Sequence, residues 1–156
     1  MTVHVVVATD GSAASLAAAS QFQRIADGRE VTEVTVVAVV SPYAAVPFAN
    51  ELAGRRPAGP TELSFQEEAA AAVASVAAVF DGWGPRVHTQ VRSGSPAAEI
   101  IKAAEEVDAG LISLASGGRG LTATILLGTT AARVQHSAPC PVLVCRPTRW
   151  DDATRT

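Results

Sequence analysis

The feature that most constrains this chain is a regular alternation of short apolar runs with segments of helical spacing. Four of the five runs are almost continuously apolar and rich in Val and Ile, which is typical of strands buried on both faces of a parallel sheet. The segments between them have the length of crossover helices. In chain order, the runs are Val3–Ala8, Glu33–Val40, Val87–Val91, Leu111–Ala115 and Val142–Cys145.

This alternation predicts one α/β domain over residues 1–147, followed by a polar tail over residues 148–156. The expected architecture has three layers: an open parallel sheet of five strands, in the order 3-2-1-4-5, and four helices on its two faces. The third run, Val87–Val91, alternates apolar and polar residues, so we expect it at an edge. Helices are expected over residues 12–27, about 61–80, 96 to about 107, and 129 to about 137.

Local signals mark where these helices begin. Ser12 follows a turn and is expected to cap the first helix, and Ser95 with Pro96 is a favourable start for the third. Ser64 and Glu67 have the spacing of a capping box, which makes Ser64 an alternative start for the second helix. The first helix is expected to bury one face formed by Leu16, Ala19, Phe22 and Ile25.

Composition excludes several classes of function. A chain of 156 residues with a net charge of −3 has no basic excess for duplex DNA or an anionic membrane. Only 4% of the residues are aromatic, which disfavours single-stranded nucleic acid held by base stacking. No apolar run is long enough to span a bilayer. Met1–His4 lacks the basic region of a secretory signal, so we expect a cytoplasmic protein.

Neither the cysteines nor the histidines form a recognisable site. Cys140 and Cys145 are five residues apart around a strand, so they are expected to point to opposite faces and to stay reduced. His4, His88 and His136 share no spacing typical of metal ligands, and a structural or solvated role is the simpler interpretation. No catalytic residue and no metal ligand is therefore assigned.

A glycine-rich turn after the fourth strand is the best candidate for chemistry. Gly117, Gly118 and Gly120 follow Ala115, and Gly128 precedes the fourth helix. Glycines allow the backbone to approach an anion closely, and the free N–H groups of a helix start favour negative charge. The Thr129 and Thr130 hydroxyls would add hydrogen bonds, whereas Arg119 reaches a phosphate or is simply solvated. The run is equally compatible with an ordinary turn.

The expected topology brings this turn beside Asp10. With strand order 3-2-1-4-5, the switch point lies between the first and fourth strands, where open α/β sheets bind ligands. An acidic residue disfavours a bare phosphate but suits a ribose or an adenine amino group, so Asp10 and the glycine turn together suggest a nucleotide. The alternative for Asp10 is a helix cap or turn residue, and the two roles are compatible. The segment Ser41–Pro60, rich in Pro and Gly, leaves the same edge and is either a lid or a plain insertion.

Four motifs resemble the universal stress protein family. They are VVVATDGS at 5–12, GSPAAEII at 94–101, LLGTT at 126–130 and APCPVLV at 138–144. The resemblance covers about residues 3 to 147. The resemblance implies the Rossmann-like fold of the adenine nucleotide alpha hydrolase class. Its ATP-binding motif, Gly-x2-Gly-x9-Gly-(Ser/Thr), matches at Gly118, Gly128 and Thr129, but Ala115 replaces the first glycine. Gly110 replaces the usual Asp before the fourth strand.

The resemblance implies a small cytosolic protein that binds an adenine nucleotide and acts as a stress-response sensor or regulator. The nucleotide is ATP, with AMP or ADP as alternatives, and Mg²⁺ would be held through its phosphates. A homodimer through Val142–Cys145 is implied, and at most slow hydrolysis is expected. The implied nucleotide-binding residues are Ala8, Thr9, Asp10 and Val39 near adenine, and Leu114, Ala115, Gly118, Arg119, Gly128, Thr129 and Thr130 near the ribose and phosphates.

Two other hypotheses remain open. The family has a branch without the ATP motif, and Ala115 is one step towards it, so a dimeric interaction module without nucleotide is the main alternative. An amidating enzyme of the ATP-pyrophosphatase type is disfavoured because its phosphate loop follows the first strand, where Thr9–Ser12 is too short.

Overall fold

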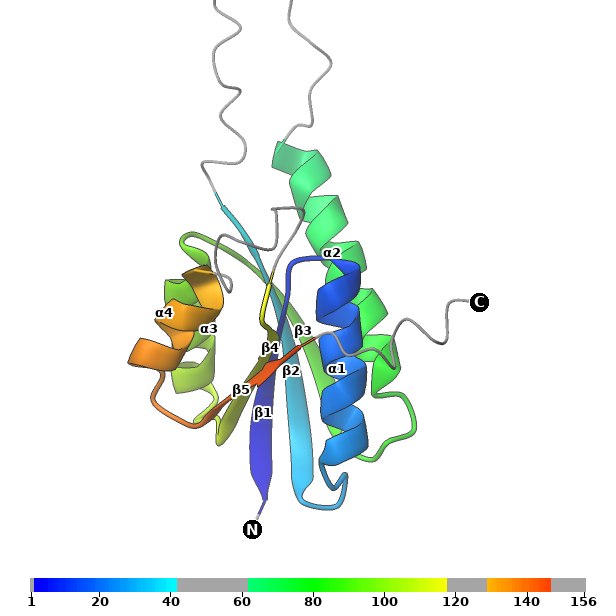
Figure 1. The fold of residues 1–156 in the computed structure, drawn as a ribbon. Helices are drawn as coiled ribbons and strands as arrows, with labels where there is room; N and C mark the ends of the chain where they lie inside the picture. Colours follow the sequence, from blue (N-terminus) through cyan, green and yellow to red (C-terminus); the bar gives the residue numbers. More distant parts are fainter. Residues whose placement is uncertain (1, 42–61, 118–128, 147–156) are drawn as a thin grey trace, which may run out of the picture.

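A computed structural model describes residues 2–41, 62–117 and 129–146, without the side chains of residues 62–64. Within these residues, five strands alternate with four helices, as the apolar runs predict (Figure 1). The bounds are β1 Val3–Thr9, α1 Ala13–Ile25, β2 Val31–Val40, α2 Glu62–Val79, β3 Arg86–Ser93, α3 Pro96–Glu106, β4 Leu111–Ala115, α4 Thr129–Ser137 and β5 Val142–Cys145.

The five strands form one parallel sheet in the order β3-β2-β1-β4-β5, which confirms the predicted topology. β1 lies at the centre and pairs with β2 on one side and with β4 on the other. β3 occupies an edge, as its alternating pattern predicts. Residues 42–61 and 147–156 lie outside the described residues, so the lid hypothesis for Ser41–Pro60 is not tested.

Two apolar layers explain why the central strands are apolar on both faces. Val5 and Val7 of β1 point into a cluster with α1 and α2, whereas Val6 points into a second cluster with α3 and α4. Figure 1 shows α1 and α2 on one side of the sheet and α3 and α4 on the other. All three Val side chains are at most 1% exposed. A polar residue on either face of β1 would therefore have to be desolvated.

The buried face of α1 differs from the prediction. Ala19 and Phe22 are buried, but Leu16 is 40% exposed and Ile25 is 68% exposed. Residues spaced by three drift about 60° per step around a helix of 3.6 residues per turn. Leu16 and Ile25 consequently fall on opposite sides of the true stripe, which consists of Ser15, Ala18, Ala19 and Phe22.

The helix starts agree only in part with their sequence signals. Ser12 caps α1 as predicted, since its hydroxyl accepts a hydrogen bond from the Ser15 amide at 3.2 Å. Ser95 occupies the N-cap position of α3 before Pro96, but its side chain makes no capping hydrogen bond. α2 begins at Glu62, which places Ser64 inside the helix and rules it out as the start.

Gly110 has a packing reason that is independent of any ligand. A Cβ added at this glycine would lie 2.8 Å from Cγ1 of Val3, and the Gly110 amide donates to the His4 carbonyl at 2.9 Å. The Val3 side chain therefore leaves no room for a Cβ at this position unless it shifts. As expected, the departure from the family's usual Asp concerns packing at the amino end of β4, away from the carboxyl edge of the sheet.

Candidate functional site

The carboxyl ends of β1 and β4 meet at the predicted switch point. Val7 of β1 is in register with Ser113 of β4, so continuing both strands by two residues brings Thr9 level with Ala115. After β1 the chain crosses to the face covered by α1, whereas α4, which follows β4, packs on the opposite face. In open α/β sheets, ligands bind at strand ends where the following connections diverge to opposite faces in this way.

The turn from β1 into α1 is fixed by a dense set of hydrogen bonds. The buried Thr9 hydroxyl accepts from the Gly11 amide at 3.1 Å and lies 2.7 Å from the Ser15 hydroxyl. Gly11 has φ of 79°, a conformation that glycine adopts without strain. The Thr9 side chain is therefore committed to the turn, and what it can offer a ligand at the edge is its backbone.

Asp10 has a structural role that can be seen directly. Its Oδ1 accepts a hydrogen bond from the Ser12 amide at 2.9 Å, and the residue is exposed at the edge of the sheet. The turn role considered for Asp10 is thus confirmed. A carboxylate held by one oxygen still carries its charge at the surface, where a ribose or amino group can approach it.

The strand residues of the candidate site contribute backbone rather than side chains. Ala8 and Leu114 are buried in the cluster below α3 and α4, and half-buried Val39 packs against that cluster. Among the described residues other than glycine, positive φ occurs only at Asp108. Ala115, at the end of β4 beside Cys145, is therefore not in the backbone conformation that would require glycine.

The phosphate side of the candidate site is described only in part. Thr129 is exposed and Thr130 is half-buried at the start of α4, where the first N–H groups of a helix lack helical partners. Gly118, Arg119 and Gly128 lie outside the described residues. The structure therefore brings Ala8, Thr9, Asp10, Leu114 and Ala115 to one edge, with Val39 near the end of β2.

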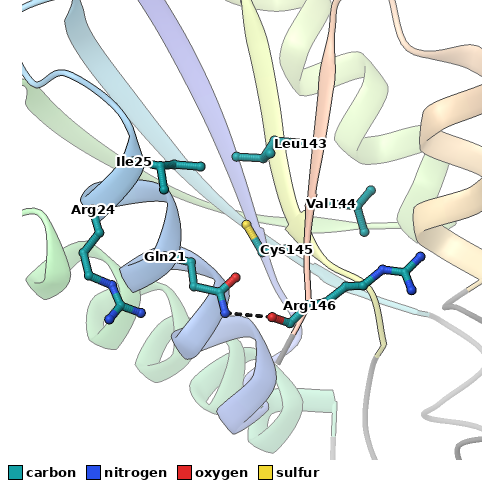
Figure 2. Close-up of a pocket in the computed structure, with 7 residues that line it drawn as sticks. All are labelled: Gln21, Arg24, Ile25, Leu143, Val144, Cys145 and Arg146. Atoms are coloured by element: carbon teal, nitrogen blue, oxygen red, sulfur yellow. Dashed lines mark hydrogen bonds between the residues drawn. The ribbon is translucent and has the colours of Figure 1, made fainter. Parts of the chain in front are cut away.

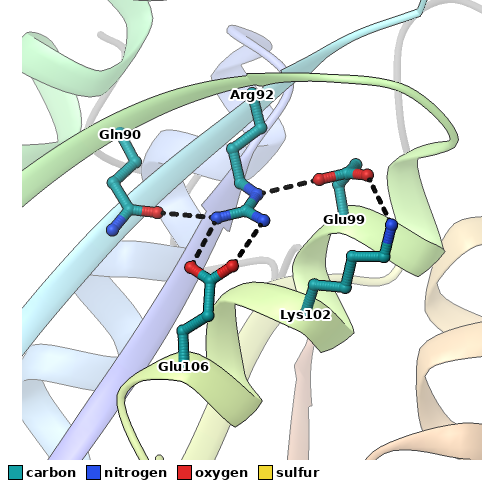
Figure 3. Close-up of polar contacts among 5 residues, drawn as sticks. All are labelled: Gln90, Arg92, Glu99, Lys102 and Glu106. Atoms are coloured by element: carbon teal, nitrogen blue, oxygen red, sulfur yellow. Dashed lines mark hydrogen bonds and ion pairs between the residues drawn. The ribbon is translucent and has the colours of Figure 1, made fainter.

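One polar cluster near this edge was not anticipated from the sequence. The guanidinium of Arg92, at the end of β3, bonds Glu106 through two nitrogens at 2.9 and 3.0 Å and Glu99 through Nε at 2.9 Å (Figure 3). Lys102 Nζ also donates to Glu99, at 3.3 Å. Glu99 and Glu106 are seven residues apart, two turns along one helix face, which is the signal that could have revealed them.

A second cluster lies at the amino end of the sheet. Glu33 of β2 accepts from Arg86 at 2.6 Å and lies 3.1 Å from His88 Nε2, both on β3. His4 Nδ1 is 3.7 Å from the same carboxylate, and His4 Nε2 is 2.7 Å from the Thr35 hydroxyl. Burial lowers the pKa of His4, and this outweighs the opposite effect of Glu33. Partial burial raises the pKa of Glu33, but its hydrogen bond with His88 and the nearby positive charges hold it below its usual value.

An apolar groove borders the opposite edge of the sheet. It has a volume of about 490 Å³ and runs between α1 and β5 (Figure 2). Gln21 donates to the Arg146 carbonyl at 2.7 Å, which fastens the end of β5 to α1. The groove is lined by Gln21, Arg24, Ile25, Leu143, Val144, Cys145 and Arg146.

The described residues contain neither a candidate metal-binding cluster nor a candidate membrane-spanning helix. In residues 2–41, 62–117 and 129–146, no group of three or more His, Cys, Asp or Glu side chains is arranged to hold a metal ion. Cys140 and Cys145 are both free thiols. None of the helices in the described part of the chain combines the length and apolar character that a membrane crossing requires.

This chain is similar to known proteins both in sequence and in fold. A family model, the universal stress protein family, matches residues 1–146. A universal stress protein of Methanocaldococcus jannaschii is 36% identical over 145 residues, covering 91% of this chain and 81% of that protein. The solved structure of hypothetical protein MJ0577 has a TM-score of 0.75 at 24% identity, covering 96% of this chain and 99% of that one.

Two further solved structures contain adenine nucleotides. One is a universal stress protein in complex with cAMP, at 22% identity and a TM-score of 0.58, covering 93% of this chain and 97% of that one. The other is a universal stress protein family protein from Arabidopsis thaliana with AMP bound, at 16% identity and a TM-score of 0.62, covering 96% and 94%. At these identities both show a shared fold. Together with the family model that matches almost the whole chain, the comparisons show that this protein belongs to the universal stress protein family.

Proposed function

We propose that this protein binds an adenine nucleotide across the carboxyl edge of β1, β2 and β4. The observation that carries the proposal is the meeting of the β1 and β4 ends at the switch point of the sheet. Side chains there are turned into the core or tied into the turn, so the groups left for a ligand are backbone N–H and C=O groups and the Asp10 carboxylate. Such a site suits an uncharged base next to a phosphate chain.

Each end of the nucleotide has its own set of residues in this proposal. The end of β1 with Val39 receives the adenine, and the turn after β4 with the start of α4 receives the ribose and phosphates. Ala115 fits this arrangement because its backbone does not require glycine. The proposed contacts are Ala8, Thr9, Asp10, Val39, Leu114, Ala115, Gly118, Arg119, Gly128, Thr129 and Thr130.

The ligand is ATP in this proposal, with AMP and ADP as alternatives. The printed ligands of two structural neighbours, cAMP and AMP, share the adenosine and differ in the phosphate, which supports recognition of the adenine end. The carboxylate at the β1 edge, Asp10, is engaged with the Ser12 amide. Any Mg²⁺ would therefore be held mainly by the phosphates.

A sensor or regulator in the cytoplasm fits these residues better than a catalyst. Fast phosphoryl transfer needs a base or a water-positioning group near the reacting phosphate. The sequence motifs of the site supply glycines and hydroxyls, with Asp10 as the acidic member. At most slow hydrolysis is proposed.

A second candidate function is a dimeric interaction module that does not use nucleotide. The observation that favours it is the apolar groove beside β5, which in the described part of the sheet pairs only with β4. An apolar strand with a free edge is prone to pair with another chain. We propose that the strand Val142–Cys145 pairs with a second copy, and this dimer is compatible with either function.

The decisive experiment asks what the purified protein carries. The protein is denatured after extensive desalting, and the released small molecules are identified by mass spectrometry. Released ATP, ADP or AMP supports the nucleotide site. If nothing is released and calorimetry detects no heat with millimolar ATP, the nucleotide proposal is wrong and the interaction module takes its place.

Two glycine variants then locate the site. Gly118→Val is expected to block the approach of the phosphates and weaken ATP binding by about tenfold or more, which corresponds to about 1.4 kcal/mol. Gly117→Val is the matched control, because a Cβ at Gly117 has no atom of the described residues within 4 Å. Equal ATP affinity in the Gly118→Val and Gly117→Val proteins contradicts this placement.

Ala115→Gly tests the departure from the family motif. The variant is expected to keep or raise the affinity for ATP, because removal of the methyl group relieves crowding at the end of β4. Calorimetric titration of the variant and the native protein, side by side, measures this. A clear loss of affinity would mean that the Ala115 methyl itself contacts the ligand.

A further inference from the structure

All three guanidinium nitrogens of Arg92 donate hydrogen bonds to side chains of the protein, although the residue lies on an edge strand. Its fork bonds both oxygens of Glu106, Nε bonds Glu99, and Nη1 also reaches Gln90 at 3.3 Å (Figure 3). The Arg92 and Glu99 side chains are only 17% and 14% exposed. Charged hydrogen bonds of this kind fix both distance and orientation. Arg92 thereby fastens the end of β3 to two successive turns of α3.

The held Glu99 in turn packs against the β3–α3 turn. Gly94 has φ of 143°, and a Cβ at this position would lie 3.0 Å from both Cγ and Oε1 of Glu99. The Glu99 amide also donates to the Ser95 carbonyl at 2.9 Å. Glu99 thus holds the turn in two ways: its side chain packs against Gly94, and its amide bonds Ser95 at the start of α3.

This turn bears directly on the end of β2. The Gly94 amide donates to the Val40 carbonyl at 3.0 Å, and Val40 is the last residue of β2. Its neighbour Val39 is in register with Arg92 itself. A continuous set of contacts thus runs from Arg92 through Glu99 and Gly94 to the edge of the sheet where Val39 lies.

We propose that Arg92 is a positioning residue for the adenine end of the nucleotide site. By holding Glu99 against Gly94, it fixes the turn whose amide anchors the end of β2 beside Val39. This inference rests on the proposed nucleotide function and adds a residue that does not belong to the motifs of the site. Arg92 acts through its neighbours, because its guanidinium nitrogens are already bonded within the protein.

Arg92, Glu99 and Glu106 keep their charges at neutral pH. The hydrogen bonds with Glu106 and Glu99 raise the pKa of Arg92 despite its partial burial. The same bonds with Arg92 lower the pKa of both carboxyl groups, Glu99 and Glu106. The contacts are therefore expected to remain intact at neutral pH and to be lost when Arg92 is replaced.

The test compares Arg92→Gln with two matched proteins. Arg92→Lys keeps the charge but loses the planar fork, so it is expected to recover part of the function. Arg86→Gln removes another arginine from β3, one that is also paired with a carboxylate but lies at the opposite end of the strand. Circular dichroism first establishes that each variant is folded.

Binding is measured by displacement of a fluorescent ATP analogue with either ATP or inorganic tripolyphosphate. Arg92→Gln is expected to weaken ATP binding by about tenfold, equivalent to about 1.4 kcal/mol, while the affinity for tripolyphosphate changes little. Arg86→Gln should match the native protein for both ligands. Equal weakening for ATP and tripolyphosphate, or no weakening for ATP, overturns the assignment to the adenine end.

Hydrogen exchange separates failure of this inference from failure of the nucleotide proposal. Arg92→Gln should accelerate exchange of the Gly94 amide, which bonds Val40, and leave the Gly110 amide, which bonds His4, unchanged. If the native protein binds no ATP, the nucleotide proposal fails and the adenine role falls with it. In that case, faster exchange of the Gly94 amide in Arg92→Gln would still show that Arg92 anchors the end of β2. Unchanged exchange would show that it does not.

Discussion

The two edges of the sheet are built in opposite ways. The β3 edge is eight residues long and carries Arg86, His88 and Arg92, each paired with a carboxylate on a neighbouring element. The β5 edge is four residues long, consists of Val142–Cys145 and borders an apolar groove. Both edges end the described sheet, yet only β3 carries charged residues within the strand, whereas the charges near β5, Arg24 and Arg146, lie beside it.

This contrast indicates which edge is suited to pair with another chain. Charged side chains on an edge strand oppose the approach of a second strand, because each charge would have to lose its water or its partner. The residues of β5 itself carry no charge to desolvate, and Ile25 beside this edge is 68% exposed. We therefore expect β5, and not β3, to pair with a second copy of the chain.

The largest effect is expected from a charge on the β5 edge. Leu143→Asp should weaken the proposed dimer by about 100-fold or more, since an aspartate enclosed in the strand interface would have to lose its water. Sedimentation at several protein concentrations measures the dimer. Thr89→Asp, at an exposed position on β3, is the matched control and should leave self-association unchanged.

Because Leu143 packs partly against the core, a second variant keeps this test decisive. Ile25→Asp changes the groove at an exposed α1 position that contributes little to folding. It should weaken the dimer in the same direction with little change in Tm. A dimer that survives both substitutions is not formed through this edge.

A smaller effect is expected when the carboxylate that organises the amino end of β3 is removed. Glu33→Ala leaves Arg86 and His88 without their common partner, so Tm should fall by about 2–4 °C at pH 7.5. Glu68→Ala, at an exposed position on α2, should change Tm much less. Equal Tm values for the two variants would mean that the cluster does not stabilise the β3 edge.

The smallest effect concerns pH. The pKa of His4 is lowered in the folded protein, so below about pH 6.5 the unfolded chain takes up the proton more readily and stability falls. The groups that face His4 are Glu33, His88 and Thr35. In His4→Gln, the decrease in Tm between pH 7.5 and 5.5 should be smaller by about 1–3 °C.

The control for this pH dependence is His136→Gln, at an exposed position on α4. Its change in Tm between the two pH values should equal that of the native protein. If His4→Gln also behaves like the native protein, burial of His4 does not contribute to acid sensitivity.

Much of the fold could be predicted from hydrophobic pattern alone. The bounds of β4 and β5 were predicted to the residue, and the edge position of β3 followed from its alternation. The buried face of α1 was predicted wrongly, because the spacing of Leu16 and Ile25 does not reveal which stripe meets the sheet. Ser95 likewise has a capping sequence but makes no capping bond.

The sequence predicted where the candidate site lies better than it predicted the hydrogen bonds that its residues make. The neighbouring ends of β1 and β4 follow from the strand order 3-2-1-4-5, which was an assumption at the level of the sequence and which the structure shows. The double role of the Thr9 hydroxyl, towards Gly11 and Ser15, has no signature in the sequence. The Arg92 cluster was missed because its partners come from a strand and a helix that only meet once the chain is folded.

The sequence by itself determined the fold class and the edge position of β3, because burial on one or two faces leaves its period in every element. The strand order, and with it the edge at which a ligand is expected, rests on the tertiary structure. Tertiary structure decided which polar groups are already taken: the Thr9 hydroxyl, one oxygen of Asp10 and the guanidinium of Arg92. Periodicity records which face of an element is buried. A hydrogen bond or ion pair depends instead on the turn geometry and on the distance between packed elements, even where its residues are near in the chain, as these are.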